Sequence, residues 1–484
     1  MKRTWIQAAT IAALLTILGA GAGIGADDPG RLGEVRGDTL FVARDKVIAA
    51  ALERNEMLAA SAAMKDAAAA QAQGAWRGFL PQLQLGEFFL RSDDALSAFG
   101  FKLMNRGATP LDFGFTDAGF VPGLLNEPGE TNNHITRIQL MQPLFNGGMG
   151  IYGKQAANAA SRASEFQHLR AGETIEFRAV QAFEGLALAK AYEGVMLAAV
   201  ASAEGHVRQA QSMVDNEMAT EADLLQARVH LSALKQRLIE VRNMVAVAGE
   251  YIKLLTATET DLPLAADTTL LDEAAAAAPV TFDPDRALER SDLEARRQEA
   301  QAAGKMVGVA RGAMLPHINL GLQKDYYSLD RVFGNDADSW SLGVYATWDV
   351  FKGLQNISEL KKARAEKRAV EHMVDFETRQ ARVQATEAWL NVKAAHEKVQ
   401  VARDAVAAAR EGLRIVTNQY REGLAGMVDL LDTQAAATMA EGNLVQALHD
   451  FNVGLANLTF MGAARSGAAT GDTGNDNPRP RPGR

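Results

Sequence analysis

The chain has 484 residues, with 59 acidic against 50 basic side chains and a formal net charge of −9 at pH 7. This acidic balance argues against nucleic acid as a partner, because phosphate contacts need a basic patch. The sequence contains no cysteine, which excludes disulfides, thiolate metal sites and a lipid attached to an N-terminal cysteine.

The first 26 residues have the order of a secretory signal peptide. Lys2 and Arg3 precede an apolar stretch, Ile6 to Leu18, that is too short to cross a bilayer as a helix. Small residues follow, with cleavage expected after Ala22 or Ala26; the alternative is a retained N-terminal anchor. At the other end, the Gly-, Asn- and Pro-rich segment 463–484 is expected to be disordered.

Between these ends, the same motifs occur twice in the same order. Residues 51–54 (Ala-Leu-Glu-Arg) return at 287–290, and residues 223–225 (Asp-Leu-Leu) return at 429–431, an offset of 206. A constant offset over a long span indicates an internal repeat. We therefore predict two repeats, 27–265 and 266–462.

Each repeat is predicted to have a leading helix, a hairpin of two strands and then two long helices. The offset falls by 29 between Pro81 and Pro143, so the first copy carries an insertion there, within an outward-facing loop at 91–133. The predicted elements are leading helices at 39–77 and 285–311, strand hairpins at 80–145 and 315–351, and long helices at 148–256 and 354–461.

The predicted strands alternate apolar with polar or small residues. Trp340, Leu342 and Val344 alternate with Ser341 and Gly343. Alternation over about ten residues is typical of a membrane-spanning strand with one face to lipid and one to a lumen. A half-buried strand of a soluble sheet gives the same pattern, so the strands alone leave both alternatives open.

The helical segments are unusually long. Residues 148–214 and 354–420 contain no proline, and each would reach about 100 Å at about 1.5 Å per residue. Apolar residues every three or four positions favour coiled-coil packing. Short breaks at 215–220 and 421–427, before restarts near Asp223 and Asp429, predict two antiparallel helical hairpins.

Four strands per chain predict association, because an open sheet edge is not tolerated in lipid. Two copies would give eight strands, whose interior side chains fill, whereas three would give twelve and begin to leave a lumen. The predicted fold class is mainly α with a membrane β-barrel portion: three copies form a twelve-stranded barrel continued by an α-helical periplasmic tunnel.

The duplicated Ala-Leu-Glu-Arg helix, Leu-Pro strand openings, Phe-x-Gly strand ends and Asp-Leu-Leu restarts, over 39–462, resemble the TolC-like outer-membrane efflux proteins. The resemblance implies a homotrimer in outer-membrane lipid that extends into the periplasm. It implies a periplasmic adaptor protein and an inner-membrane pump as partners, and no cofactor. The expected function is the outer-membrane channel-tunnel of a tripartite efflux system exporting small toxic molecules.

The resemblance also implies a periplasmic gate at the helix tips. Tyr420 matches a tyrosine that pairs with an aspartate in the closed state, and Asp223 matches that aspartate; Asp429 and Asp432 match acids that ring the entrance. The alternative for Asp223 and Asp429 is capping of the helix N-terminus.

The second tip carries the implied adaptor contact. Gly423-Leu424-Ala425 resembles the tip sequence that the adaptor grips, but Ala425 replaces an arginine of the closed-state network. That departure either weakens the closed state or leaves the role to Arg421.

The alternatives of another class are an enzyme and a structural coiled-coil protein. The eight histidines have no zinc-hydrolase spacing, and the sequence has no phosphate-binding Gly-Lys-Ser/Thr loop or Gly-x-Ser-x-Gly turn, so we predict no enzyme, catalytic residue or metal. A non-conducting periplasmic coiled-coil protein would leave the alternating strands unused. Within the duct function, the alternative is the outer-membrane duct of a type I protein secretion system.

Overall fold

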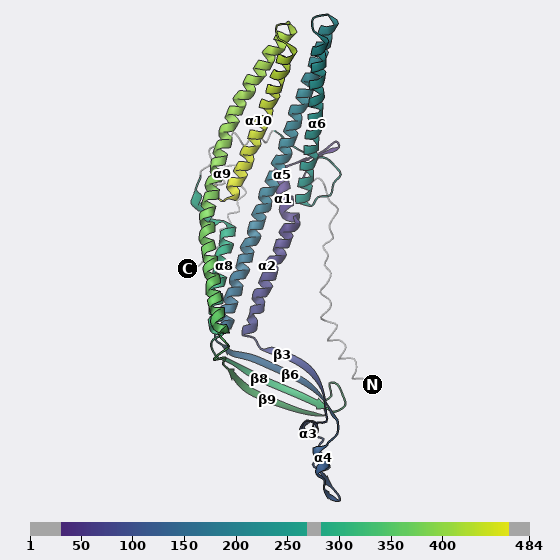
Figure 1. The fold of residues 1–484 in the computed structure, drawn as a ribbon, viewed down its shortest axis with the longest axis vertical. Coiled ribbons are helices and arrows are strands. Elements are labelled where there is room, and N and C mark those ends of the chain that lie inside the picture. The colour runs from purple at the N-terminus through teal and green to yellow at the C-terminus, as the bar shows by residue number, and fades with distance from the viewer. Residues whose placement is uncertain (1–30, 269–281, 464–484) are drawn as a thin grey trace. The chain divides into compact units, whose positions relative to one another are not determined.

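Two helices of 67 residues each, α5 (Met149–Asp215) and α9 (Gln355–Arg421), run through the computed structural model, which describes residues 31–268 and 282–463 (Figure 1). The chain divides into two compact units, each built from segments of both predicted repeats. The first holds residues 31–56, 174–268 and 390–457, and the second holds residues 57–173, 282–389 and 458–463. The repeat boundaries stay a prediction, and the expected signal peptide and the tail from 464 lie outside the described residues.

The second unit contains a four-stranded antiparallel sheet in the order β3-β6-β8-β9. The two predicted strand hairpins are thus confirmed, and they pair with each other through β6 and β8. The outer strands β3 and β9 each have one edge without a partner strand in the described chain. The bounds are β3 Gln82–Ser92, β6 Thr131–Asn146, β8 His317–Ser328 and β9 Ala337–Thr347.

The register of this sheet separates an apolar face from a polar face. Leu83, Leu140, Leu322 and Leu342 are directly paired across the four strands and form one row. The next row, on the opposite face because side chains alternate, is Gln84, Gln139, Gln323 and Ser341. One face therefore suits lipid and the other an aqueous lumen.

The polar face also carries an ion pair. The Nε atom of Arg137 donates to Oδ1 of Asp325 at 2.9 Å, and Gln323 donates to Oδ2 of the same carboxylate at 2.7 Å. The Asp325 side chain is 6 % exposed, so these bonds compensate a nearly desolvated charge. This ion pair links β6 to β8 on the polar face.

The insertion between β3 and β6 is more ordered than the predicted loop. It contains a ten-residue helix, a small hairpin and a short helix, and α3 packs on β6. Asp94 caps α3 by accepting from the backbone N–H of Ser97 at 2.8 Å. The bounds are α3 Ala95–Met104, β4 Phe115–Thr116, β5 Gly119–Phe120 and α4 Pro122–Asn126.

The remaining helices of the second unit pack along the sheet-proximal parts of α5 and α9. The turn from β6 into α5 needs Gly147, whose φ is +64° and whose absent Cβ would collide with the backbone of Gly312. These helices are α2 (Glu56–Gly74), the 3₁₀ turn η3 (Ala75–Gly78), the 3₁₀ turn η5 (Pro284–Glu289) and α8 (Ser291–Gly312).

The first unit holds both helical hairpins and a small sheet that the sequence did not predict. The helix expected at 39–77 is wrong at its start, because 39–42 is a strand, and it is interrupted at Asn55. Strand β2 pairs with β1 and, in parallel, with β7 more than 200 residues later. The bounds are β1 Gly33–Arg36, β2 Thr39–Val42, α1 Arg44–Arg54, α6 Glu221–Thr256, β7 Leu264–Ala266 and α10 Met427–Phe460.

Helix α5 contains an 18-residue window that is apolar enough, by composition, to cross a membrane. Its apolar character has another explanation in the first unit, where Phe183, Leu186 and Ala187 are 0 % exposed. These side chains form the packed seam of a helix in contact with other helices, as the predicted spacing of apolar residues indicated.

Candidate functional site

Both helical hairpins turn with the same backbone motif. At the first tip the N–H of Met218 donates to the carbonyl of Met213, and at the second the N–H of Leu424 donates to the carbonyl of Gln419, both at 2.8 Å. Glu217 and Gly423 occupy the left-handed position, with φ of 59° and 72°. These are Schellman turns, which satisfy the last carbonyls of α5 and α9 and reverse the chain.

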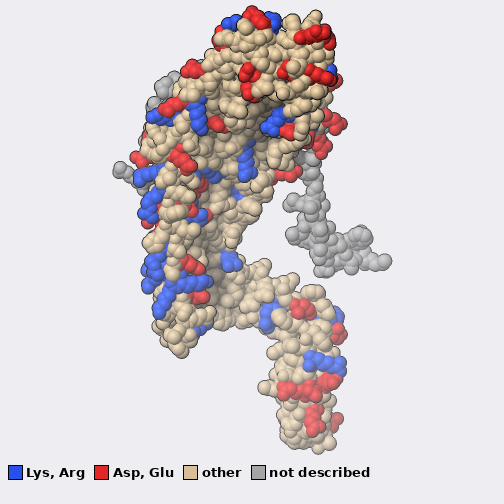
Figure 2. All heavy atoms as spheres, turned by 45° about the horizontal axis from the view of Figure 1, so that its top comes forward, with Lys and Arg blue, Asp and Glu red and all other residues tan. Residues whose placement is uncertain are grey.

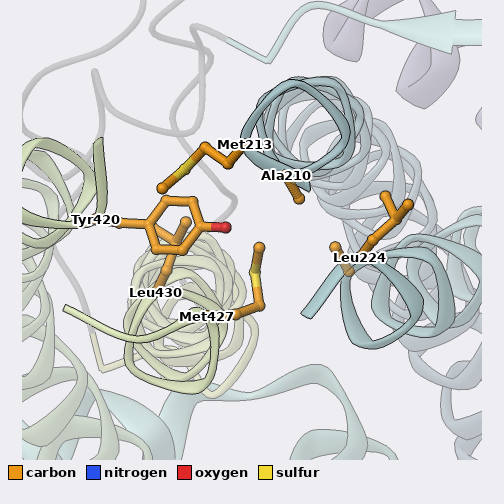
Figure 3. Close-up of a cluster of buried hydrophobic side chains, with 7 residues drawn as sticks. Ala210, Met213, Leu224, Tyr420, Met427 and Leu430 are labelled. Carbon is orange, nitrogen blue, oxygen red and sulfur yellow. The ribbon is translucent and has the colours of Figure 1, made fainter. Parts of the chain in front are cut away.

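A hydrophobic cluster lies directly behind the two tips and joins the two hairpins (Figure 3). We call it the tip cluster; its buried members come from α5, α6, α9 and α10, so the two turns are held together by one core. Its buried residues are Ala210, Met213, Leu224, Ala227, Tyr420, Met427 and Leu430.

Tyr420 is the one polar side chain of the tip cluster. It is 3 % exposed, its ring lies among Met213, Met427 and Leu430, and its hydroxyl points into the cluster (Figure 3). That hydroxyl has no hydrogen-bond partner among the described residues. Burial, and secondarily the negative charge of Asp223, raise the pKa of Tyr420. A buried hydroxyl without a partner is costly, so the packing of the Tyr420 ring in the tip cluster is obtained at the expense of this group.

Asp223 takes part in a capping box rather than in a hydrogen bond to Tyr420. Its Oδ2 accepts from the N–H and the hydroxyl of Thr220, at 3.0 and 2.8 Å, while Thr220 Oγ1 accepts from the N–H of Asp223. Within one chain the structure therefore favours the capping alternative. Asp223 still lies close enough to raise the pKa of Tyr420, and their role in a gate stays a prediction.

Asp429 makes one of the two hydrogen bonds of a capping box at the start of α10. Its Oδ2 accepts from the backbone N–H of Gly426 at 3.0 Å, and a glycine has no side chain to return the bond. Asp432, one turn later, is exposed and has no ion pair or hydrogen bond in the described part of the chain. The two helix starts come slightly earlier than predicted, at Glu221 and Met427.

The predicted adaptor segment is on the surface of the second tip. Leu424 is 74 % exposed, while Ala425 packs against the tip cluster. The sequence interpretation missed Met218, which occupies the same position in the first tip and is 64 % exposed.

The tips are strongly acidic. Residues 215–223 and 421–432 hold seven acidic side chains and one basic side chain, Arg421. Figure 2 shows acidic side chains gathered at the end of the hairpins. Arg421 is exposed and forms no ion pair with any described residue, so a single chain gives no sign that it replaces the missing arginine.

A histidine pair lies between the hairpins behind the tip cluster. His206 of α5 is 6 % exposed, and its Nε2 lies 3.2 Å from Ser202 Oγ and 3.4 Å from Gln434 Oε1 on α10. Burial lowers the pKa of His206, and His230 on α6 lowers it further. Nε2 of His230 is buried without a partner. Across 31–268 and 282–463 no group of three or more potential metal ligands occurs.

The sequence of this chain is similar to those of outer membrane efflux proteins. Residues 284–462 match the family described as outer membrane efflux protein. The chain is 25 % identical over 322 residues to the outer membrane efflux protein BepC of Brucella suis, covering 65 % of this chain and 68 % of BepC.

Solved structures share the fold at low identity. CusC, a transmembrane channel, superposes with a TM-score of 0.74 and 16 % identity, covering 90 % of this chain and 96 % of CusC. The outer membrane protein VceC of Vibrio cholerae superposes with a TM-score of 0.70 and 19 % identity, covering 87 % and 96 %. The predicted location in the outer membrane, reaching into the periplasm, agrees with these matches, and the predicted resemblance to TolC-like outer-membrane efflux proteins is confirmed.

Proposed function

We propose that three copies of this chain form the channel-tunnel of a tripartite efflux system, which exports small toxic molecules with a periplasmic adaptor and an inner-membrane pump. The observation that carries the proposal is the four-stranded sheet. It has a leucine row on one face, a glutamine row on the other and two edges without partners. Pairing β3 of one copy with β9 of the next closes a twelve-stranded barrel and removes every open edge.

The helical hairpins support the tunnel part of the proposal. Three copies bring six tips together, with the acidic residues of each tip in a ring. Asp223, Tyr420, Asp429 and Asp432 then form the periplasmic gate. The buried ring of Tyr420 supports this role, because it packs in the tip cluster that joins the two hairpins of one chain and so sets where their tips lie.

The adaptor contact is proposed at Gly423, Leu424 and Ala425. Leu424 is an exposed apolar side chain on a turn whose conformation is fixed by Gly423. An exposed apolar side chain on a rigid turn can be buried by a partner protein. Met218 presents a similar side chain on the first tip, so each chain offers two related contacts. The proposed role is transport without catalysis.

The first experiment measures the mass of the purified protein in detergent together with its single-channel conductance in a planar bilayer. The proposal predicts a trimer with a small, cation-preferring conductance, because acidic tips concentrate cations at the narrowest point. A monomer without conductance contradicts the proposal and favours a structural coiled-coil protein.

A further inference from the structure

Helix α3 in the insertion is apolar on two opposite faces, and only one of them is covered within the chain. Ala98, Phe101 and Asn105 face the sheet and are at most 8 % exposed. Leu96 and Leu103, half a turn away around the helix, are 81 % and 49 % exposed. A helix at the surface of a soluble domain has a polar outer face, whereas a helix that is apolar all round is buried. The outer face of α3 therefore needs a cover.

The contact between α3 and the sheet favours the lumen over lipid as the surroundings of α3. Asn105 donates to the side-chain oxygen of Asn133 on β6 at 2.9 Å, and Asn133 is 0 % exposed. By the alternation of β6, Asn133 lies on the same face as Arg137 and Gln139, which is the polar face. Helix α3 thus packs at the end of the sheet (Figure 1), and its bond to Asn133 lies on the face that would line the lumen.

The insertion that carries α3 is held in place by several polar contacts. Lys102 pairs with Asp112 at 2.6 Å, and Asp112 also accepts from the backbone N–H of Thr109 at 2.8 Å. These bonds lower the pKa of Asp112 to about 2. Arg106, just after α3, donates to the backbone carbonyl of Asp338 on β9 at 3.0 Å. The insertion is therefore an ordered element rather than a loose loop.

The dimensions of a twelve-stranded barrel let three such helices cover its mouth. Strands about 4.8 Å apart and tilted by about 40° close into a ring of about 12 Å radius, measured to the strand backbones. Inward side chains, about 5 Å deep by half the spacing of packed sheets, narrow the lumen to about 7 Å in radius. Each helix with its side chains is about 10–12 Å across, so three helices at the strand ends are wide enough to cover this opening and to meet on the axis.

We propose that α3 is an outer plug of the duct: the three copies of α3 meet on the barrel axis through Leu96 and Leu103 and occlude the extracellular mouth. The occupant of the exposed face is the same helix of the two other copies. The inference rests on the proposed trimer and adds a second closure, separate from the helix tips. Export then requires the three helices to part.

The absence of cysteine makes proximity directly testable in the full-length protein. We expect Leu96→Cys to give covalently linked chains when the purified trimer is oxidised, because the three residues approach on the axis. Leu322→Cys is the control: it is exposed on the apolar face of β8, a strand with partners on both sides, at least two strand spacings (about 10 Å) from the nearest neighbouring copy. No crosslink at Leu96, or equal crosslinking at both positions, overturns the plug.

A second measurement tests occlusion without depending on the helix tips. Gln139→Cys places a thiol on the polar face below α3, where a membrane-impermeant thiol reagent added outside intact cells reaches it only through the mouth. We expect labelling to be at least tenfold faster when Leu96→Ser and Leu103→Ser are added, and equal rates overturn the plug. The mass of the protein in detergent shows which proposal is wrong. A trimer that shows neither the crosslink nor the faster labelling contradicts the plug alone. A monomer contradicts the proposed function as well.

Discussion

Glu217 and Gly423 hold the same left-handed position in two turns that are 206 residues apart in the chain, with φ of 59° and 72°. Only the second turn has the residue type that adopts this conformation without a steric cost. The first tip therefore stores strain that the second does not, although both make the same pair of backbone hydrogen bonds.

Replacing Gly423 by alanine should destabilise the second tip by about 1–2 kcal/mol, because a Cβ is unfavourable at this φ. Hydrogen exchange of the Leu424 amide, which donates to Gln419, measures this locally. Gly412→Ala is the matched control, since Gly412 lies inside α9, where a Cβ would meet only Thr433 Cγ2 at an ordinary contact distance of 4.0 Å, and alanine there should stabilise by up to about 1 kcal/mol. Unchanged exchange in Gly423→Ala would contradict the turn geometry.

Tyr420 is predicted to act on the tips through its ring and not through its hydroxyl. Tyr420→Phe should change the free energy of unfolding by less than about 1 kcal/mol, because the hydroxyl has no partner within the chain. It should also leave single-channel conductance unchanged, because the hydroxyl points into the tip cluster of its own chain and does not reach a neighbouring copy. Tyr420→Ala removes a buried ring and should cost about 3–5 kcal/mol. A large stability loss in Tyr420→Phe would show that the hydroxyl is paired within one chain.

The acidic tips are predicted to set ion selectivity. Asp429 and Asp432 are three residues apart, so both lie on one side of α10 and, in a trimer, contribute six carboxylates to the entrance. Asp429→Ala combined with Asp432→Ala should raise anion conductance in planar bilayers. Glu411→Ala, an exposed carboxylate further along α9 that pairs with Arg414, is the control. Unchanged ion selectivity in the double variant would contradict the placement of Asp429 and Asp432 at the entrance.

Acidification is predicted to loosen the packing of α5 against α10. The pKa of buried His206 lies below its ordinary value of 6.5, so the unfolded chain binds more protons than the folded chain at mildly acidic pH. Stability contributed by neutral His206 is present above about pH 6.5 and is lost as the pH falls below it. Thermal unfolding between pH 8 and 5.5 measures this, and His206→Gln should flatten the dependence. The exposed His372→Gln should leave it unchanged.

The two faces of the sheet are predicted to differ sharply in their tolerance of charge. Leu322→Arg puts a charge on the apolar face and should cost about 2–4 kcal/mol in a bilayer. Gln323→Arg, the next residue on the opposite face, should cost much less because its side chain reaches water. Urea unfolding in lipid vesicles measures both. Equal costs would contradict the assignment of the faces.

The long helices and the four strands could be predicted because their signals are local and repeated. Helix α5 was expected at 148–214 and is observed at 149–215, and its copy agrees as closely. The small sheet was missed because β2 pairs in parallel with β7, more than 200 residues away, and four-residue strands show no clear period. The break at Asn55 was missed for the same reason, since its side chain donates to the carbonyl of Leu255.

At the candidate site, too, local features could be predicted from the sequence and contacts between distant residues could not. The sequence located the tips, but the resemblance suggested a pair between Tyr420 and Asp223 that one chain does not make. A capping box competes for the same carboxylate, and the pattern Thr-x-x-Asp at 220–223 was the local signal for it. The order within the insertion was not predictable, because it depends on tertiary contacts such as that between Asn105 and Asn133.

The unpaired edges of β3 and β9 have a consequence for biogenesis. A lone chain carries two exposed strand edges, which are templates for mispairing in water and are excluded from lipid. Membrane entry and oligomerisation are therefore expected to be one coupled event, with a rate that rises steeply with the concentration of exported chains. If the proposed trimer is correct, a chain that has not yet paired its edges is expected to be open to periplasmic proteases, so the number of assembled trimers should depend on the rate of export.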